Sequence, residues 1–508
     1  MHKTLSSNIF DLIHSMNKVE KKHFKLYACY HSKNARNMNY LCLFDAIERQ
    51  KEYNEEKIVR KGVVKKERLS AVKHYLHHLI LESLLVLRNK GNDTDNKLAN
   101  TLEIARIMRD KGLEKEEVKF LEKTKQLALE NERFGMALEV LTHERKAALR
   151  QPDFKALDRI KNEREILFIK LDNLKNYMML QEEVFDSVKK TYTLGNIKNK
   201  ELEKLMAHPL LCNESKALSI GAKVLYYNIL FLYNFFIGNN KTAYEIITKH
   251  LRLAEEAGIE LSELPYSKLL NNLTMVQRRL GKYQQMFSTI QKHRAVVWKS
   301  EQAKAHALLY SYINETNYSM KTGKFEKAGI AIKGIEKELE RIEREYPLKL
   351  TVLYYNIATI YFGICNYHKA LFWINKIINR QHFNFREDVQ AWAYLFRILI
   401  HYELNTPDII EHLIVSAYRF LLKREKLYEV EKSMLTFIRR LSKIDAKKKT
   451  LIEEFRRFRN ELVEITKNPD EKKALEHFDL ISWLESKIEN RSFAEIIKEK
   501  AAIPSNPR

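Results

Sequence analysis

The 508-residue chain is rich in Lys, Glu, Leu and Ile but contains only 13 glycines and 8 prolines, a composition that favours helices and leaves few residues for tight turns. We therefore expect an all-α protein, and 45% hydrophobic residues exclude a disordered chain. The net charge of +23 would attract acidic partners, nucleic acid or an anionic surface, although many basic residues are interleaved with glutamates, as in KELERIERE at 337–345.

The sequence also lacks a secretory signal, a membrane-spanning segment and paired cysteine motifs. The first residues lack the uninterrupted apolar segment of a secretory signal, so we expect a cytoplasmic protein. The most apolar run, Val224–Ile237, is shorter than the roughly twenty residues that a membrane span needs. The cysteines are far apart and form no CxxC motif, which predicts neither disulfides nor a zinc site. They are Cys29, Cys42, Cys212 and Cys365.

The first 90 residues are predicted to form a separate helical domain. Helices are expected at Asn8–Met16, Lys18–Tyr30 and Lys66–Arg88, and the polar linker NKGNDTDN at Asn89–Asn96 marks the boundary. A helical array should follow over residues 93–468. Residues 469–508 should form capping helices and a tail, with an amphipathic segment at Phe478–Lys500.

A repeated turn organises the middle of the chain. A small residue is followed two positions later by an aromatic residue and five positions later by alanine, as in GKFEKA from Gly323 and CNYHKA from Cys365. Weaker copies start at Gly281 and Gly238, so the four turns are 43, 42 and 42 residues apart. The same step reaches further turn-forming residues outside these four. They are Gly112, Pro152, Gly195, Asn405 and Asp445. A period of this size predicts an α-solenoid of stacked helical hairpins.

These residues resemble the tetratricopeptide repeat (TPR). The segment YYNIATIYFGICNYHKALFWINKI at Tyr354–Ile377 is similar to the family pattern in both helices of one unit. The period of about 42 residues departs from the family unit of about 34, which implies longer helices. Both ends also resemble those of a group of bacterial helical-repeat proteins of unknown function. The resemblance implies a fold and a binding role but no particular partner.

Motifs for catalysis are missing from the sequence. There is no GxSxG, GxxxxGK, GxGxxG or HExxH motif. His74, His77 and His78 fall on one helix and could hold a metal, but an ordinary helix face is the preferred interpretation. Glu20 and His23 form a single ExxH pair, whereas a di-iron bundle needs two. We expect a protein that is not an enzyme and has no cofactor or metal.

One asparagine recurs in each of three repeats. Asn272, Asn314 and Asn356 each lie nine residues before a predicted turn. The TPR resemblance implies that this position faces the concave groove, where an amide can bind the backbone of an extended peptide. Hydrogen bonding between neighbouring helices is the alternative. Lys268, Tyr310 and Tyr355 are further candidate groove residues, although tyrosine at helical spacing more often belongs to a core.

The N-terminal domain offers a second binding hypothesis. Residues 1–90 carry 18 basic and 9 acidic side chains, and the turn before the helix at Lys66–Arg88 is especially basic. Its proportions resemble a helix-turn-helix, so contacts with nucleic-acid phosphates are possible. The candidates are Lys57, Arg60, Lys61, Lys65, Lys66 and Arg68. Our leading hypothesis remains an adaptor that binds a peptide or helix of another protein in the groove, and the alternative is a nucleic-acid-binding regulator.

Overall fold

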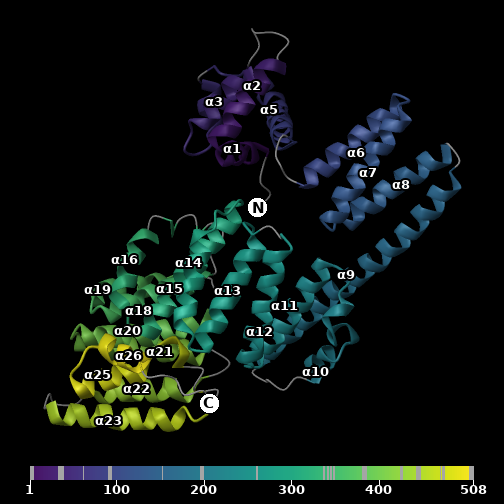
Figure 1. Cartoon of the computed structure of the whole chain (residues 1–508). Helices are drawn as coiled ribbons and strands as arrows, with labels where there is room; N and C mark the ends of the chain where they lie inside the picture. Colours follow the sequence, from purple (N-terminus) through teal and green to yellow (C-terminus); the bar gives the residue numbers. More distant parts are fainter. Residues whose placement is uncertain are drawn as a thin grey trace. The chain divides into compact units, whose positions relative to one another are not determined.

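The computed structural model describes residues 5–31, 39–60, 62–89, 94–150, 153–194, 200–258, 261–335, 349–379, 386–423, 427–441, 448–468 and 475–502, with single residues or pairs between 338 and 346 and at 471. Within these residues all regular structure is helical and no β-strand is present (Figure 1). The all-α prediction is therefore confirmed for the described part of the chain. The contacts divide the chain into two units, Met1–Lys175 and Asn176–Arg508, which we describe separately.

The first unit contains two groups of helices with separate cores. The first group consists of α1 (Leu5–Ser15), α2 (Lys18–His31), α3 (Asn39–Glu48), α4 (Glu55–Arg60) and α5 (Lys66–Asn89). Its core holds Phe24, Phe44 and Leu76, which are all fully buried. The second group consists of α6 (Thr94–Asp110), α7 (Glu114–Glu130), α8 (Phe134–Arg150) and the first part of α9 (Phe154–Leu194). The predicted domain of residues 1–90 thus has its own core, while the division into units falls later, after Lys175.

The second unit is a succession of paired helices. After α10 (Lys200–Met206) come α11 (Ile220–Phe236), α12 (Asn240–Glu256), α13 (Leu264–Arg279), α14 (Tyr283–Ala295), α15 (Glu301–Thr322), α16 (Phe325–Ile335), α18 (Leu350–Gly363), α19 (Tyr367–Ile378), α20 (Glu387–Glu403), α21 (Pro407–Leu422), α22 (Glu429–Leu441), α23 (Lys448–Ile465), α25 (Leu480–Glu489) and α26 (Phe493–Ala502). Successive helices pack as pairs, such as α13 with α14 and α18 with α19, and the first helices of neighbouring pairs, α13, α15, α18 and α20, also contact one another.

The turns between paired helices lie at positions predicted from the sequence. The turn residues have positive φ angles, a conformation that ends a helix and that glycine and asparagine adopt most readily. They are Gly238 (82°), Gly281 (68°), Gly323 (71°), Cys365 (59°) and Asn405 (53°), with Gly112 (72°) in the first unit. The expected turns at Pro152, Gly195 and Asp445 lie outside the described residues. After the turns at Gly238, Gly323 and Cys365 the alanine five positions later is buried and lets the two helices approach closely; these residues are Ala243, Ala328 and Ala370.

Candidate functional site

Two of the three predicted groove asparagines join neighbouring helices. Asn314 on α15 is 3% exposed, and its Nδ2 donates hydrogen bonds to Asn271 Oδ1 (2.9 Å) and Thr274 Oγ1 (2.8 Å) on α13. Asn356 on α18 is 5% exposed, and its Nδ2 donates to Thr316 Oγ1 (3.0 Å) on α15. The alternative interpretation, hydrogen bonding between helices, therefore describes these two residues. The prediction that Asn314 and Asn356 contact a peptide is therefore wrong, because their buried amides are hydrogen-bonded within the fold and do not face an open groove.

The other predicted groove residues differ in exposure. Lys268 is exposed and Asn272 is half-buried, both on α13, and no hydrogen bond to another described residue involves the Asn272 side chain. Tyr310 is half-buried, with its ring 4.3 Å from that of His306. Tyr355 is 2% exposed and belongs to the core. Tyr355 is thus also excluded as a surface contact, because its ring is enclosed by packed side chains.

The C-terminal helices cover the array in the region of α15, α18 and α20. Trp483 on α25 donates a hydrogen bond from its indole Nε1 to Glu403 Oε1 (2.6 Å) at the end of α20, and Lys487 Nζ lies 2.6 Å from the same carboxylate oxygen. The rings of Phe478 and Phe493 stack on each other (5.3 Å), and both contact Phe362 on α18 (5.6 and 5.9 Å). Helix α18 is buried along almost all of its length, and it also packs on α15, α16, α19 and α20. The predicted capping segment therefore packs as part of the core.

An ionic cluster joins the same segment to α20. Asp388 accepts two hydrogen bonds from Arg386, at 2.8 and 2.7 Å, and lies 3.3 Å from His477 Nε2 in the short 3-10 helix Leu475–His477. Burial alone would raise the pKa of Asp388, but the hydrogen bonds from His477 and Arg386 hold it well below its usual range. The carboxylate therefore stays ionised at neutral pH and attracts His477 when that ring is protonated.

A buried serine lies between two histidines in the middle of the unit. Ser267 Oγ is 2.7 Å from His293 Nε2 and 2.7 Å from His306 Nδ1, and all three residues are at least 95% buried. Burial lowers the pKa of His293 to about 4 and that of His306 to about 3, so both rings are neutral at pH 7. A Ser–His contact is also found in hydrolases, but none of these three residues lines the pocket described next. This cluster stabilises the packing of α13, α14 and α15.

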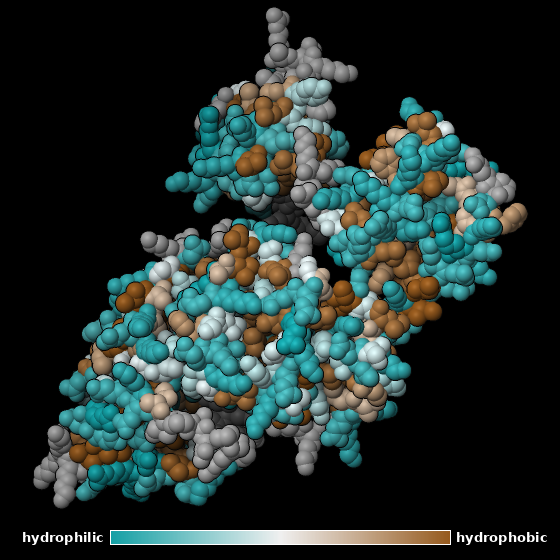
Figure 2. All heavy atoms as spheres, in the orientation of Figure 1, coloured by the Kyte–Doolittle hydropathy of each residue, from teal (hydrophilic) through white to brown (hydrophobic). Residues whose placement is uncertain are grey.

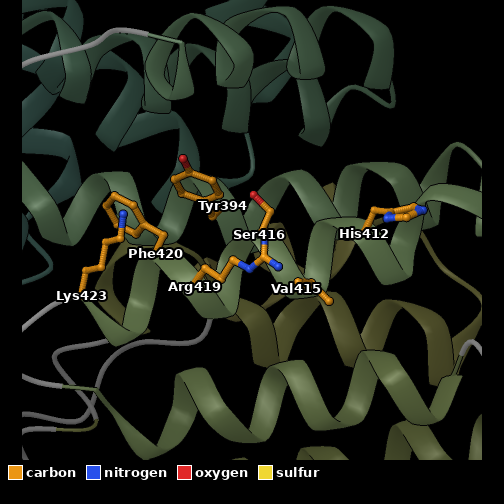
Figure 3. A pocket seen from close by; sticks show the side chains of 7 residues that line it. All are labelled: Tyr394, His412, Val415, Ser416, Arg419, Phe420 and Lys423. Carbon is orange, nitrogen blue, oxygen red and sulfur yellow. The ribbon is translucent and has the colours of Figure 1, made fainter.

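The outer surface of α20 and α21 forms a pocket that sequence reasoning missed (Figure 3). Its volume is about 340 Å³, at the lower end of the roughly 300–1,000 Å³ typical of ligand sites. Tyr394 on α20 and Phe420 on α21 stack with ring centroids 4.6 Å apart and form an aromatic wall. We call this hollow the α20–α21 pocket. It is lined by Tyr394, His412, Val415, Ser416, Arg419, Phe420 and Lys423.

Basic side chains dominate the rim of this pocket. His412, Arg419 and Lys423, which we call the basic stripe, are exposed and lie on one face of the α21 segment and its cap. No acidic residue lines the pocket, and no ion pair involves these three within the described part of the chain. Arg397 on α20 has its guanidinium 5.4 Å from the Tyr394 ring. The pocket therefore carries the positive charges of Arg419 and Lys423 beside an aromatic surface.

An apolar row lies next to the basic stripe on the same helix. Val415, Tyr418 and Leu422 are 41%, 46% and 55% exposed, and their spacing of three and four residues aligns them on one face. We call these residues the apolar stripe. Figure 2 shows that the visible face of the second unit is mainly hydrophilic, with scattered hydrophobic patches. Helix α21 thus exposes a basic stripe and an apolar stripe side by side.

The predicted nucleic-acid contacts lie at the surface of the first unit. Lys57 and Arg60 on α4, and Lys65, Lys66 and Arg68 at the start of α5, are exposed, whereas Lys61 lies outside the described residues. Gly62, with φ of 67°, turns the chain between α4 and α5. The exposed positions are compatible with contacts to phosphates.

Neither a metal site nor a membrane span is found in the described regions. Where the structure describes side chains, no three or more His, Cys, Asp or Glu residues gather as metal ligands; His74 and His78 are exposed on α5, and His78 Nε2 lies 3.7 Å from Glu82 Oε1. None of the helices there combines the length and the apolar character needed to cross a bilayer. No protein-family model and no curated protein matches the sequence.

Proposed function

We propose that this chain is a non-enzymatic, cytoplasmic interaction scaffold, an α-solenoid of TPR-like hairpins that binds a segment of a partner protein. The succession of paired helices and the left-handed turns at Gly238, Gly281, Gly323, Cys365 and Asn405 support the solenoid with a period of about 42 residues.

The observation that carries the proposal is the surface of α21. Its apolar stripe is 41–55% exposed beside a pocket with an aromatic wall and a basic rim. Aromatic and arginine side chains next to exposed apolar surface are typical of protein interfaces. The predicted groove is less suitable, because Asn314, Asn356 and Tyr355 are buried. Lys268 and Asn272 remain proposed contacts of an extended peptide on α13.

Affinity purification with quantitative mass spectrometry tests this function. We would compare the wild type with the double variant Tyr418→Ser, Leu422→Ser, and with Ile330→Ser, Phe372→Ser as a control that removes exposed apolar groups (73% and 55% exposed) from α16 and α19. A partner retained by the wild type and the control but lost by the α21 variant supports the proposal. Equal recovery with all three proteins contradicts it.

Nucleic-acid binding by the first unit is a second candidate function, favoured by the exposed basic residues around the turn between α4 and α5. The full-length protein should then shift random duplex DNA at low salt, and the triple variant Lys65→Glu, Lys66→Glu, Arg68→Glu should not. An unchanged shift in that variant would eliminate this candidate.

A further inference from the structure

Resting on the proposed function, we infer that the partner segment bound by α21 is an acidic amphipathic helix. Its carboxylates face the basic stripe, its apolar side chains pack on the apolar stripe, and one large side chain enters the α20–α21 pocket. Three features of the structure lead to this assignment.

The first feature is the positive charge of Arg419 and Lys423, which no acidic side chain in the pocket lining compensates. His412, Arg419 and Lys423 have no acidic neighbour in the pocket lining, whereas Arg439 on the next helix lies 3.8 Å from Glu411. The Nε atom of Arg397 is buried without a hydrogen-bond partner among the described residues. A partner that supplied carboxylates would neutralise this region, and a basic partner would be repelled.

The second feature is the spacing of these three side chains, each of which can donate a hydrogen bond to a carboxylate. At 1.5 Å per residue, Arg419 is about 10 Å from His412 along the helix axis and about 6 Å from Lys423. A second helix packed along α21 presents side chains four and seven residues apart at the same intervals. An extended strand repeats side chains on one face about every 7 Å, which matches the shorter interval but not the longer one. The stripe therefore favours a helix over an extended peptide.

The third feature is the adjacent apolar stripe. Val415 and Leu422 are seven residues apart with Tyr418 between them, which is the spacing of side chains along the seam between two packed helices. Because this stripe adjoins the basic stripe, a complementary helix would carry leucine or phenylalanine on one face and glutamate on the neighbouring face. Such a helix in a shallow groove is a common mode of peptide recognition.

Fluorescence anisotropy with designed peptides tests the inference on the full-length protein. The probe is a labelled helical peptide with leucines at heptad spacing and glutamates on one flank, compared with a scrambled peptide of the same composition and with a version in which lysine replaces glutamate. We expect binding of the acidic helix only, with affinity that falls as salt increases. The variant Arg419→Glu, Lys423→Glu should weaken binding on the order of tenfold or more.

The controls separate this inference from the proposed function. Lys241→Glu, Lys249→Glu makes the same charge change at exposed positions on α12 and should leave binding unchanged. If Tyr418→Ser, Leu422→Ser abolishes binding but the charge reversal does not, the surface binds a partner and the acidic assignment is wrong. If a single-stranded oligonucleotide, added at the same concentration of negative charge as the acidic peptide, displaces that peptide, the assignment is overturned in favour of nucleic acid. No binding of the acidic helix at about 1 mM, or no effect of either variant, would also overturn it.

Discussion

The indole Nε1 of Trp483 donates a hydrogen bond to the carboxylate of Glu403, 80 residues earlier in the chain, at 2.6 Å. The Glu403 side chain is only 9% exposed, and Lys487 provides its second partner. A buried carboxylate that loses a donor remains desolvated without full compensation. This contact therefore anchors the C-terminal helices to α20.

Trp483→Phe should lower the free energy of unfolding by about 1–3 kcal/mol, because phenylalanine keeps most of the ring but removes the donor to Glu403. Urea denaturation measures the loss. Trp298→Phe is the matched control: Trp298 is 7% exposed, and its indole nitrogen forms no hydrogen bond to a described residue. Equal destabilisation by both substitutions would mean that the hydrogen bond contributes nothing measurable.

Asn314→Ala should destabilise the protein by about 1–3 kcal/mol, because it leaves the buried Asn271 side chain without its donor. Asn272→Ala should change stability by no more than about 0.5 kcal/mol, since that side chain is half-buried and forms no hydrogen bond to a described residue. Thermal denaturation of both variants checks the contrast. A similar loss at the two positions would contradict the distinction between a helix-joining asparagine and a surface asparagine.

Gly323→Ala should loosen helix α26. A Cβ atom at this residue would lie 2.8 Å from the Ala494 carbonyl oxygen and from Lys498, in addition to the strain of φ at +71°. Gly238→Ala carries the backbone strain alone, roughly 1–2 kcal/mol, because nothing lies within 4 Å of its Cβ position. Hydrogen–deuterium exchange should show faster uptake in 493–502 for the first variant only. Slow uptake there in both would show that the C-terminal helices do not depend on this close approach.

Stability should fall as the pH drops from 6.5 towards 4. Burial lowers the pKa values of His250 and His293 to about 4 and that of His306 to about 3, whereas an unfolded histidine titrates near 6.5. In this window the unfolded chain binds protons that the folded chain does not. The stabilisation is therefore complete above about pH 6.5 and is lost progressively below it, on the order of 2 kcal/mol for each ring by pH 5.

Urea denaturation at pH 7.5 and pH 5 measures this dependence. His250→Phe should reduce it by about a third, because His250 stacks on Tyr227 (5.9 Å) and its Nδ1 has no partner among the described residues. The same pH dependence in the variant and the wild type would show that this ring does not titrate as its burial implies.

Local features could be predicted from the sequence, and packing could not. The turns at Gly281 and Gly323 follow from backbone preferences of single residues, so their positions are visible in the sequence. The role of Asn314 depends on its hydrogen bond to Asn271, 43 residues earlier. An asparagine at position 314 suits a peptide contact in a groove and a hydrogen bond between helices equally well. The regular spacing of the asparagines in the sequence therefore could not show which of these two roles they have.

The α20–α21 pocket shows the same limit. The basic stripe on α21 has helical spacing that the sequence displays. The hollow beside it exists because Tyr394 on a different helix stacks on Phe420, and no local pattern specifies that contact. The packing of the C-terminal segment likewise depends on contacts between distant segments, such as that of Phe478 with Phe362.

Site-specific photo-crosslinking in cells tests the central claim most directly, namely that α21 is the partner-binding surface. A photoreactive phenylalanine analogue would replace Tyr418, and in a second protein it would replace Phe372, an aromatic residue 55% exposed on α19. We predict a light-dependent adduct with one partner protein from position 418 only, and its loss when Arg419→Glu and Lys423→Glu are added. No adduct from position 418, or the same adduct from position 372, would contradict the claim.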